Sequence, residues 1–159
     1  FANRLLKEEG VQSVVTVADR DTCADGAACY DGLIVGWGAY MLIQGRENRI
    51  AFLEAMRKRA KPQSPLLVSF YYRTPRQRSF RVTAVVGTTL RRLLRREPVE
   101  VGDSLAPNYV HYFTEEEIRD ELQQAGFELV RYDTQSYGHA VGFASTAYSA
   151  ACGPTKLAE

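Results

Sequence analysis

Few side chains in this sequence are suited to acid–base or ligand chemistry, and several of them follow short apolar runs. Asp19 and Asp21 follow one such run, and their carboxylates could accept hydrogen bonds from the N–H groups of a ligand. His111 precedes a predicted helix, where an imidazole could act as a general base. The chain has two histidines and three scattered cysteines without the paired spacing of a zinc site, so we predict no metal site.

Glycines and large aromatic residues are combined in the segment Gly36-Trp37-Gly38-Ala39-Tyr40, which follows a second apolar run. Glycine lets a backbone approach a ligand closely because it carries no Cβ. Trp37 and Tyr40 could therefore surround a bound molecule and exclude water from it. Alternatively, both could be aromatic residues of the core, and the sequence leaves the two interpretations open.

Arginine is concentrated between residues 73 and 96, which hold eight arginines and no acidic residue. A basic run of this kind can bind phosphates or nucleic acid. The following residues, 97–128, hold nine acidic residues that would neutralise it, so we favour a solvated helix face. Arg73, Arg76 or Arg78 could instead hold an acidic ligand through bidentate hydrogen bonds.

Composition and charge exclude several classes of protein. A length of 159 residues suits one domain, and 45% hydrophobic with 25% charged residues is typical of a globular chain rather than a disordered one. The net charge of +1 provides no overall field for nucleic acid or membrane. No apolar run approaches the roughly 20 residues that span a bilayer, and no segment resembles a signal peptide. We predict a cytoplasmic protein, since a reducing compartment is the default for so few cysteines.

The apolar pattern predicts alternating strands and helices that close in a hairpin. Thr114 and Glu117 have the spacing of a capping box at a helix start. The order predicts an α/β protein with a three-layer, mostly parallel sheet, in which ligands bind beyond the carboxyl ends of the strands. The expected strands are 11–17, 30–35, 65–72, 127–132 and 139–144, and the expected helices are 1–10, 46–60, a segment from 81 onward with an apolar stripe of Val82, Val85, Val86, Leu90, Leu93 and Leu94, and 114–126.

Several sequence blocks occur in a characteristic order over most of the chain. They are Val17-Ala18-Asp19, Tyr30 to Val35, the helix from Arg46 to Ala60 with Lys61-Pro62, Leu66 to Phe70, Tyr112-Phe113-Thr114 and Ala125-Gly126-Phe127. In this order and spacing the chain resembles the C-terminal two-thirds of the class I S-adenosylmethionine-dependent methyltransferases. The resemblance implies a Rossmann-like fold, S-adenosylmethionine as cofactor and methyl transfer to a small-molecule acceptor.

The resemblance also implies which residues would hold the cofactor. Asp19 would accept a hydrogen bond from the adenine amino group, with Asp21 as the alternative position, and Arg20 would offer its backbone N–H. The sulfonium of the cofactor is positively charged, which favours a nearby aromatic face. The residues implied around it are Gly36, Trp37 and Gly38.

On the acceptor side, the resemblance implies contacts from Tyr40, Arg73 and Arg76, and a lid formed by residues 73–112. Methyl transfer depends mainly on proximity and orientation of the two reactants. A general base is needed only where the acceptor must lose a proton, and His111 is the candidate for that role.

The family's glycine-rich loop and its ribose-binding acidic residue have no counterpart here and would lie upstream of Phe1. We therefore expect a truncated chain, inactive alone, from a full-length enzyme. Residues 1–145 would form a partial methyltransferase domain, and residues 146–159 a flexible tail. An exposed sheet edge would then favour self-association.

Two alternatives to the enzyme remain at this point. The protein could be a catalytically inactive, methyltransferase-like scaffold or partner subunit. Less favoured is a nucleic-acid-binding protein that uses the arginine-rich segment.

Overall fold

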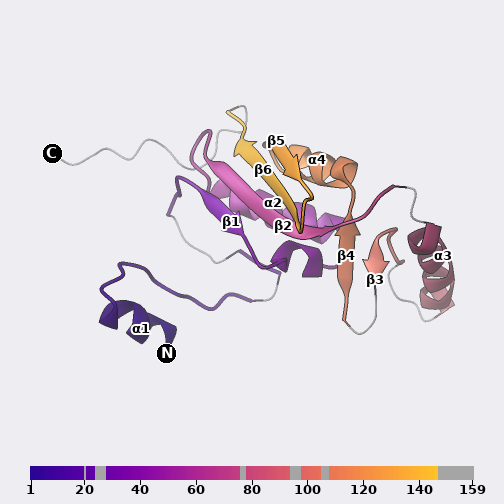
Figure 1. Ribbon diagram of the computed structural model, residues 1–159, viewed down its shortest axis with the longest axis horizontal. Helices are drawn as coiled ribbons and strands as arrows, with labels where there is room; N and C mark the ends of the chain where they lie inside the picture. Colours follow the sequence, from indigo (N-terminus) through magenta and orange to yellow (C-terminus); the bar gives the residue numbers. More distant parts are fainter. Residues whose placement is uncertain (20, 24–27, 76–77, 94–97, 105–107, 147–159) are drawn as a thin grey trace.

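A mixed sheet with helices on one face forms the centre of the computed structural model (Figure 1). The structure describes residues 1–19, 21–23, 28–75, 78–93, 98–104 and 108–146. Its elements are α1 (Ala2–Glu8), β1 (Leu33–Val35), the 3-10 helix η1 (Ala39–Leu42), α2 (Arg46–Lys58), β2 (Pro65–Tyr72), α3 (Arg78–Leu93), β3 (Asp103–Ser104), β4 (Val110–Phe113), α4 (Glu115–Gln124), β5 (Phe127–Asp133) and β6 (Gly138–Ala144). None of the helices in these described ranges is long and apolar enough to cross a bilayer.

Strand β2 is central because three strands pair with it. Strands β1 and β4 run parallel to β2, and β6 runs antiparallel to it. Strand β5 adds to β6 as the second strand of the closing hairpin, and the short β3 pairs with β4. The α/β class, with its parallel centre and antiparallel C-terminal hairpin, is therefore confirmed.

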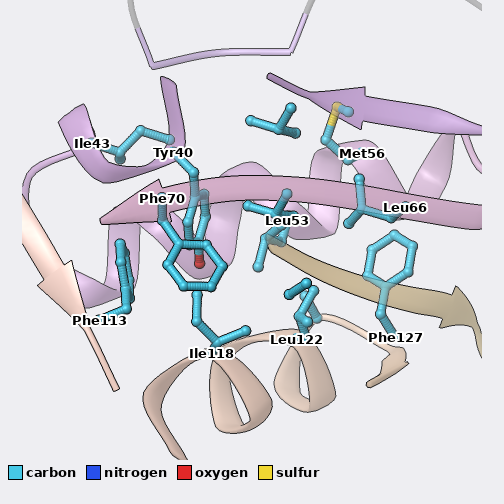
Figure 2. Close-up of a cluster of buried hydrophobic side chains, with 14 of the residues drawn as sticks. Tyr40, Ile43, Leu53, Met56, Leu66, Phe70, Phe113, Ile118, Leu122 and Phe127 are labelled. Carbon is cyan, nitrogen blue, oxygen red and sulfur yellow. The ribbon is translucent and has the colours of Figure 1, made fainter. Parts of the chain in front are cut away.

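The core lies between the sheet and the helix pair α2 and α4, which contact each other. Side chains alternate along β2, so that Leu66, Val68 and Phe70 are buried while Leu67 and Ser69 between them are only half-buried. The opposite face of the sheet is more open to solvent. Figure 2 shows side chains of both helices converging on β2: Leu53 and Met56 from α2, Ile118 and Leu122 from α4, and Leu66 and Phe70 from the strand.

Local sequence signals predicted the positions of several elements correctly. The capping box at the start of α4 is present, because the Thr114 side chain accepts from the Glu117 backbone and the Glu117 carboxylate accepts from the Thr114 backbone. Helix α1, helix α2, strand β2 and the β5–β6 hairpin lie within a few residues of their predicted positions.

The strand predicted over residues 11–17 does not form, and this prediction was wrong. A strand needs hydrogen-bond partners from another backbone segment, but the backbone of Val15 is hydrogen-bonded to the side chain of Asn3 instead. The Asn3 carboxamide donates to Val15 O at 2.8 Å and accepts from Val15 N at 2.6 Å. This pairing resembles a single rung of a β-ladder, and the neighbouring Val14 and Val17 remain exposed.

Helix α3 forms as predicted, but its valine stripe is not buried. Val82, Val85 and Val86 are 62% to 68% exposed; the side chains of Leu90, Leu93 and Leu94 lie outside the described residues. The helix packs instead through small residues. The Thr88 hydroxyl donates to the Val99 carbonyl and accepts from the Val99 backbone N–H. Gly87 lies so close to Val99 that a Cβ on it would come within 2.9 Å of a Val99 methyl. Small side chains thus bring α3 against the segment before β3, beyond the edge of the sheet (Figure 1).

A buried ion pair connects the two core helices. Arg49 of α2 and Glu121 of α4 are each 1% exposed, and Arg49 Nη2 lies 2.7 Å from Glu121 Oε1. The Tyr40 hydroxyl of η1 donates to the same carboxylate. Burial and the adjacent Glu121 charge hold the pKa of Tyr40 well above its ordinary value, so Tyr40 remains a donor. Glu100 adds a second acceptor for Arg49, at 2.9 Å.

We expect Glu121→Gln to lower the free energy of unfolding by about 3 kcal/mol, because it removes one of two carboxylates that compensate a buried guanidinium. The neighbouring Asp120→Asn is the matched control, since Asp120 forms a largely exposed pair with Arg46 and should change stability by less than about 1 kcal/mol. Urea unfolding followed by circular dichroism measures both. Equal losses in the two variants would contradict the role of the Arg49–Glu121 pair.

Candidate functional site

The loop Gly36-Trp37-Gly38 leaves the carboxyl end of β1 and holds an exposed tryptophan in a strained conformation. Trp37 has a φ of 55°, in the left-handed region that costs a residue with a Cβ about 1 to 2 kcal/mol. Its side chain is fully exposed. Strain of this kind persists where the surrounding structure enforces it, and it is concentrated at functional sites. The loop is therefore the first part of the candidate site.

Ser69 of β2 enforces this loop conformation. Its hydroxyl accepts a hydrogen bond from the Gly38 backbone N–H at 3.0 Å and donates one to the Val35 carbonyl at 3.3 Å. One side chain thus joins the last residue of β1 to the far end of the loop. We did not predict Ser69 from the sequence, although a single serine in the otherwise apolar and aromatic run of residues 65–72 was the available signal.

Glycine is favoured at position 38 because its φ of 65° is left-handed. A Cβ there would also require the flexible end of the Met41 side chain to move, since it would lie 2.5 Å from the Met41 methyl. Gly36 is less constrained, because a Cβ there would make only an ordinary contact with Ile34. The two glycines and Trp37 are adjacent at the end of β1, as the sequence predicts.

Asp19 lies in an exposed turn that precedes the sheet. Its backbone carbonyl accepts from the Thr22 hydroxyl at 2.7 Å and from the Thr22 backbone N–H at 3.3 Å. Asp21 is also exposed and has a φ of 60°. Arg20 lies outside the described residues. The adenine-binding roles of Asp19 and Arg20 stay predictions.

Tyr40 and Arg73, both predicted to contact the acceptor, instead have partners inside the protein. Tyr40 is buried, and its hydroxyl donates a hydrogen bond to the Glu121 carboxylate. Arg73 donates from Nε to the Tyr112 carbonyl and from Nη2 to the Val101 carbonyl, each at 2.9 Å, and also binds Glu117. These contacts hold β2, β4 and α4 together. Arg76 lies outside the described residues.

His111 is buried beside β3, where Asp103 orients its ring. Nδ1 of His111 lies 2.8 Å from Asp103 Oδ1, and Nε2 is buried without a hydrogen-bond partner among the described residues. Burial raises the pKa of Asp103, but hydrogen bonds from His111 and from the Glu100 backbone outweigh burial and lower it overall. An ionised Asp103 can therefore hold the imidazole in one orientation, as bases are held in enzymes. His111 itself is closed off from solvent.

The same region contains a cluster of three possible metal ligands. Oxygen atoms of Glu100 and Asp103 and a ring nitrogen of His111 lie within 4.8 Å of one another. Glu100 already binds the Arg49 guanidinium at 2.9 Å, and this positive charge opposes a second cation there. The geometry of the cluster is explained by its internal hydrogen bonds.

No protein-family model and no curated protein sequence matches the chain. Several solved structures, however, match it in fold. A methyltransferase dependent on S-adenosylmethionine from Methanosarcina mazei has a TM-score of 0.63 at 15% identity, over 89% of this chain and 76% of that one. Another, from Clostridium acetobutylicum, has a TM-score of 0.62 at 8% identity, over 91% and 70%.

A third similar structure is the 1,6-didemethyltoxoflavin-N1-methyltransferase of Burkholderia thailandensis, solved with 1,6-didemethyltoxoflavin and S-adenosylhomocysteine bound. Its TM-score is 0.61 at 14% identity, over 91% of this chain and 56% of that one. At these identities the likeness concerns the fold. The chain has the fold of the class I S-adenosylmethionine-dependent methyltransferases, as the order of its sequence blocks predicts.

We expect Ser69→Ala to loosen the loop after β1, because it removes both hydrogen bonds that hold Gly38 and Val35 together. Trp37 is the single tryptophan of the chain, so its time-resolved fluorescence anisotropy reports on this loop. The fast component should grow in Ser69→Ala, with a loss of about 1 kcal/mol in stability. Ser64→Ala removes another serine hydrogen bond, to Lys61 O, and should leave the anisotropy unchanged. Similar anisotropy in both variants would argue against the role of Ser69.

Proposed function

We propose that this protein transfers a methyl group from S-adenosylmethionine to a small-molecule acceptor. The observation that carries the proposal is the strained Gly36-Trp37-Gly38 loop at the carboxyl end of β1, in a fold shared with methyltransferases. In open α/β sheets, ligands bind beyond the carboxyl ends of the strands. The loop is therefore in the region where this fold class binds its ligands.

The loop fits the chemistry of the proposed cofactor. When bound, S-adenosylmethionine supplies an electrophilic methyl group on a sulfonium. The exposed ring of Trp37 offers a π face to this positive charge, and Gly36, where a Cβ would meet only Ile34, allows close approach of the backbone. Asp19, with Arg20 beside it, remains the proposed adenine-binding position. Among the similar structures, CalS10 of Micromonospora echinaspora was solved with S-adenosylmethionine bound.

The acceptor side is proposed in less detail. Two of the similar structures are named for small acceptors, 1,6-didemethyltoxoflavin and magnesium protoporphyrin IX. Residues 73–112 are the proposed lid, and the exposed valines of α3 support a surface that closes over a ligand. His111, oriented by Asp103, is the proposed general base, and that role requires its enclosed Nε2 to be uncovered. Arg76 remains a proposed acceptor contact, whereas Tyr40 and Arg73 are assigned to the fold.

We expect S-adenosylhomocysteine to bind with micromolar affinity, measured by calorimetric titration into the protein expressed from its entire reading frame. Asp19→Ala should weaken binding by about 5- to 150-fold, the equivalent of about 1 to 3 kcal/mol for a lost buried hydrogen bond. Asp31→Ala is the matched control, because Asp31 is an exposed partner of Lys61 and should leave the affinity unchanged. Absence of binding by the folded protein would contradict the proposal and favour an inactive scaffold.

We also propose that the protein self-associates through the β1 edge. Within the described residues, β1 pairs with β2 on one side only, and Ile34 on it is exposed. Unpaired edges recruit further strands, and a charged side chain on an edge opposes this. Light scattering should give a species larger than the monomer, and Ile34→Lys should shift it toward the monomer. Val130→Lys, on the opposite edge strand β5, should not. A monomeric unmodified protein would contradict the proposal.

A further inference from the structure

Four aromatic rings form a continuous row near the carboxyl end of β2. Phe80 of α3 lies 5.2 Å from Tyr112, Tyr112 lies 5.4 Å from Tyr71, and Tyr71 lies 5.6 Å from Tyr137, measured between ring centroids. The last two pairs are stacked, with interplanar angles of 26° and 18°. Tyr71 and Tyr112 are register partners on β2 and β4, so the sheet itself aligns the row. The row ends at Tyr137, which is 54% exposed.

Tyr137 also lines a cavity of about 340 Å³ on the more open face of the sheet. Leu67 and Val141, register partners on β2 and β6, provide apolar lining. The polar lining includes Arg131, Asp133 and His139. Most of the lining residues are polar, and Leu67, Val141 and the Tyr137 ring form its apolar part; a volume of this size can hold a small organic molecule.

The cavity and the loop that holds Trp37 lie on different sides of β2, and Ser69 of this strand connects them. His139 in the cavity wall is the register partner of Ser69, and Ser69 holds Gly38 through its hydroxyl. Partners in antiparallel strands are separated by about 5 Å between Cα atoms. Ser69 also lies on the same face of β2 as Leu67, two residues away. A molecule in the cavity would therefore be separated from the loop proposed to border the methyl donor by two strand spacings, roughly 10 Å.

The hydrogen bond of His139 defines what its other nitrogen can do. Nδ1 lies 3.1 Å from the Tyr137 carbonyl oxygen, which can only accept, so Nδ1 carries the proton. In the neutral ring, Nε2 is then an acceptor. A ligand in the cavity that carries an O–H or N–H group can donate to it.

We infer that the acceptor is a planar aromatic molecule bearing a hydroxyl or amino group, which stacks on Tyr137 in this cavity. The inference rests on the proposed methyl transfer, but His139 takes the place of His111 beside the acceptor, because His111 points to the buried face of β4 and does not line this cavity. Stacked aromatic pairs are stabilised by more free energy than the burial of their surface area alone provides. A flat aromatic ligand stacked on Tyr137 would therefore extend the existing row.

The test compares naphthol with its saturated counterpart decahydronaphthol, which keeps the hydroxyl and loses planarity. Binding to the protein is measured by ligand-observed NMR titration. We expect naphthol to bind about fivefold or more tightly, in line with the stacking contribution of an aromatic pair. Tyr137→Leu should remove most of this preference. Tyr72→Leu changes another exposed tyrosine, outside the cavity lining, and should preserve it.

Equal affinities for the two alcohols would overturn the inference, and so would a preference that survives Tyr137→Leu. Titration of S-adenosylhomocysteine into the same protein separates this failure from that of the proposed function. Cofactor binding without a preference for naphthol would overturn the aromatic acceptor alone. A Tyr137-dependent preference without cofactor binding would overturn methyl transfer and retain the cavity as an aromatic site.

Discussion

The Arg49–Glu121 pair is the constraint on which the rest of the structure depends. Two charges inside a core are costly unless hydrogen bonds compensate them, and here Tyr40, Glu100 and the pair itself supply these bonds for every buried polar atom of the pair except Arg49 Nη1, which has no partner among the described residues. Because Tyr40 belongs to η1, the pair also fixes the segment that follows the Gly36-Trp37-Gly38 loop. Ser69 holds the other side of that loop. The strain at Trp37 is thus enforced from both sides, by a buried charge network and by one hydroxyl.

The two faces of the sheet differ in what they contribute. The face under α2 and α4 carries the apolar core and closes the fold. The other face carries Leu67, Ser69 and Tyr71 at alternate positions of β2, all half-buried. Leu67 lines the cavity, Ser69 holds the loop through its hydrogen bonds, and Tyr71 belongs to the aromatic row. The alternation of side chains along one strand therefore separates the face that stabilises the fold from the face on which we propose ligand binding.

Local signals in the sequence predicted local structure well. The capping box of Thr114 and Glu117 and the apolar run of β2 each act through near neighbours, so their outcome does not depend on distant residues. The strand over 11–17 failed because a strand requires a partner that no local pattern specifies. The valine stripe of α3 failed similarly: helical spacing shows which residues share a face, but not whether another element covers it.

Local patterns also do not show which polar side chains the fold will bury, and this explains where the predicted site residues lie. Tyr40, Arg73 and His111 were chosen for the chemistry of their side chains, yet each has partners inside the fold, where polar groups must be satisfied once buried. Charged and hydrogen-bonding residues of this chain are used largely to connect η1, β3, β4 and the helices. Exposed aromatic side chains also remain near the carboxyl ends of β1 and β2, namely Trp37 and the row that ends at Tyr137. An aromatic surface of that kind can recognise a flat ring through stacking, which is the physical basis of the acceptor that we propose.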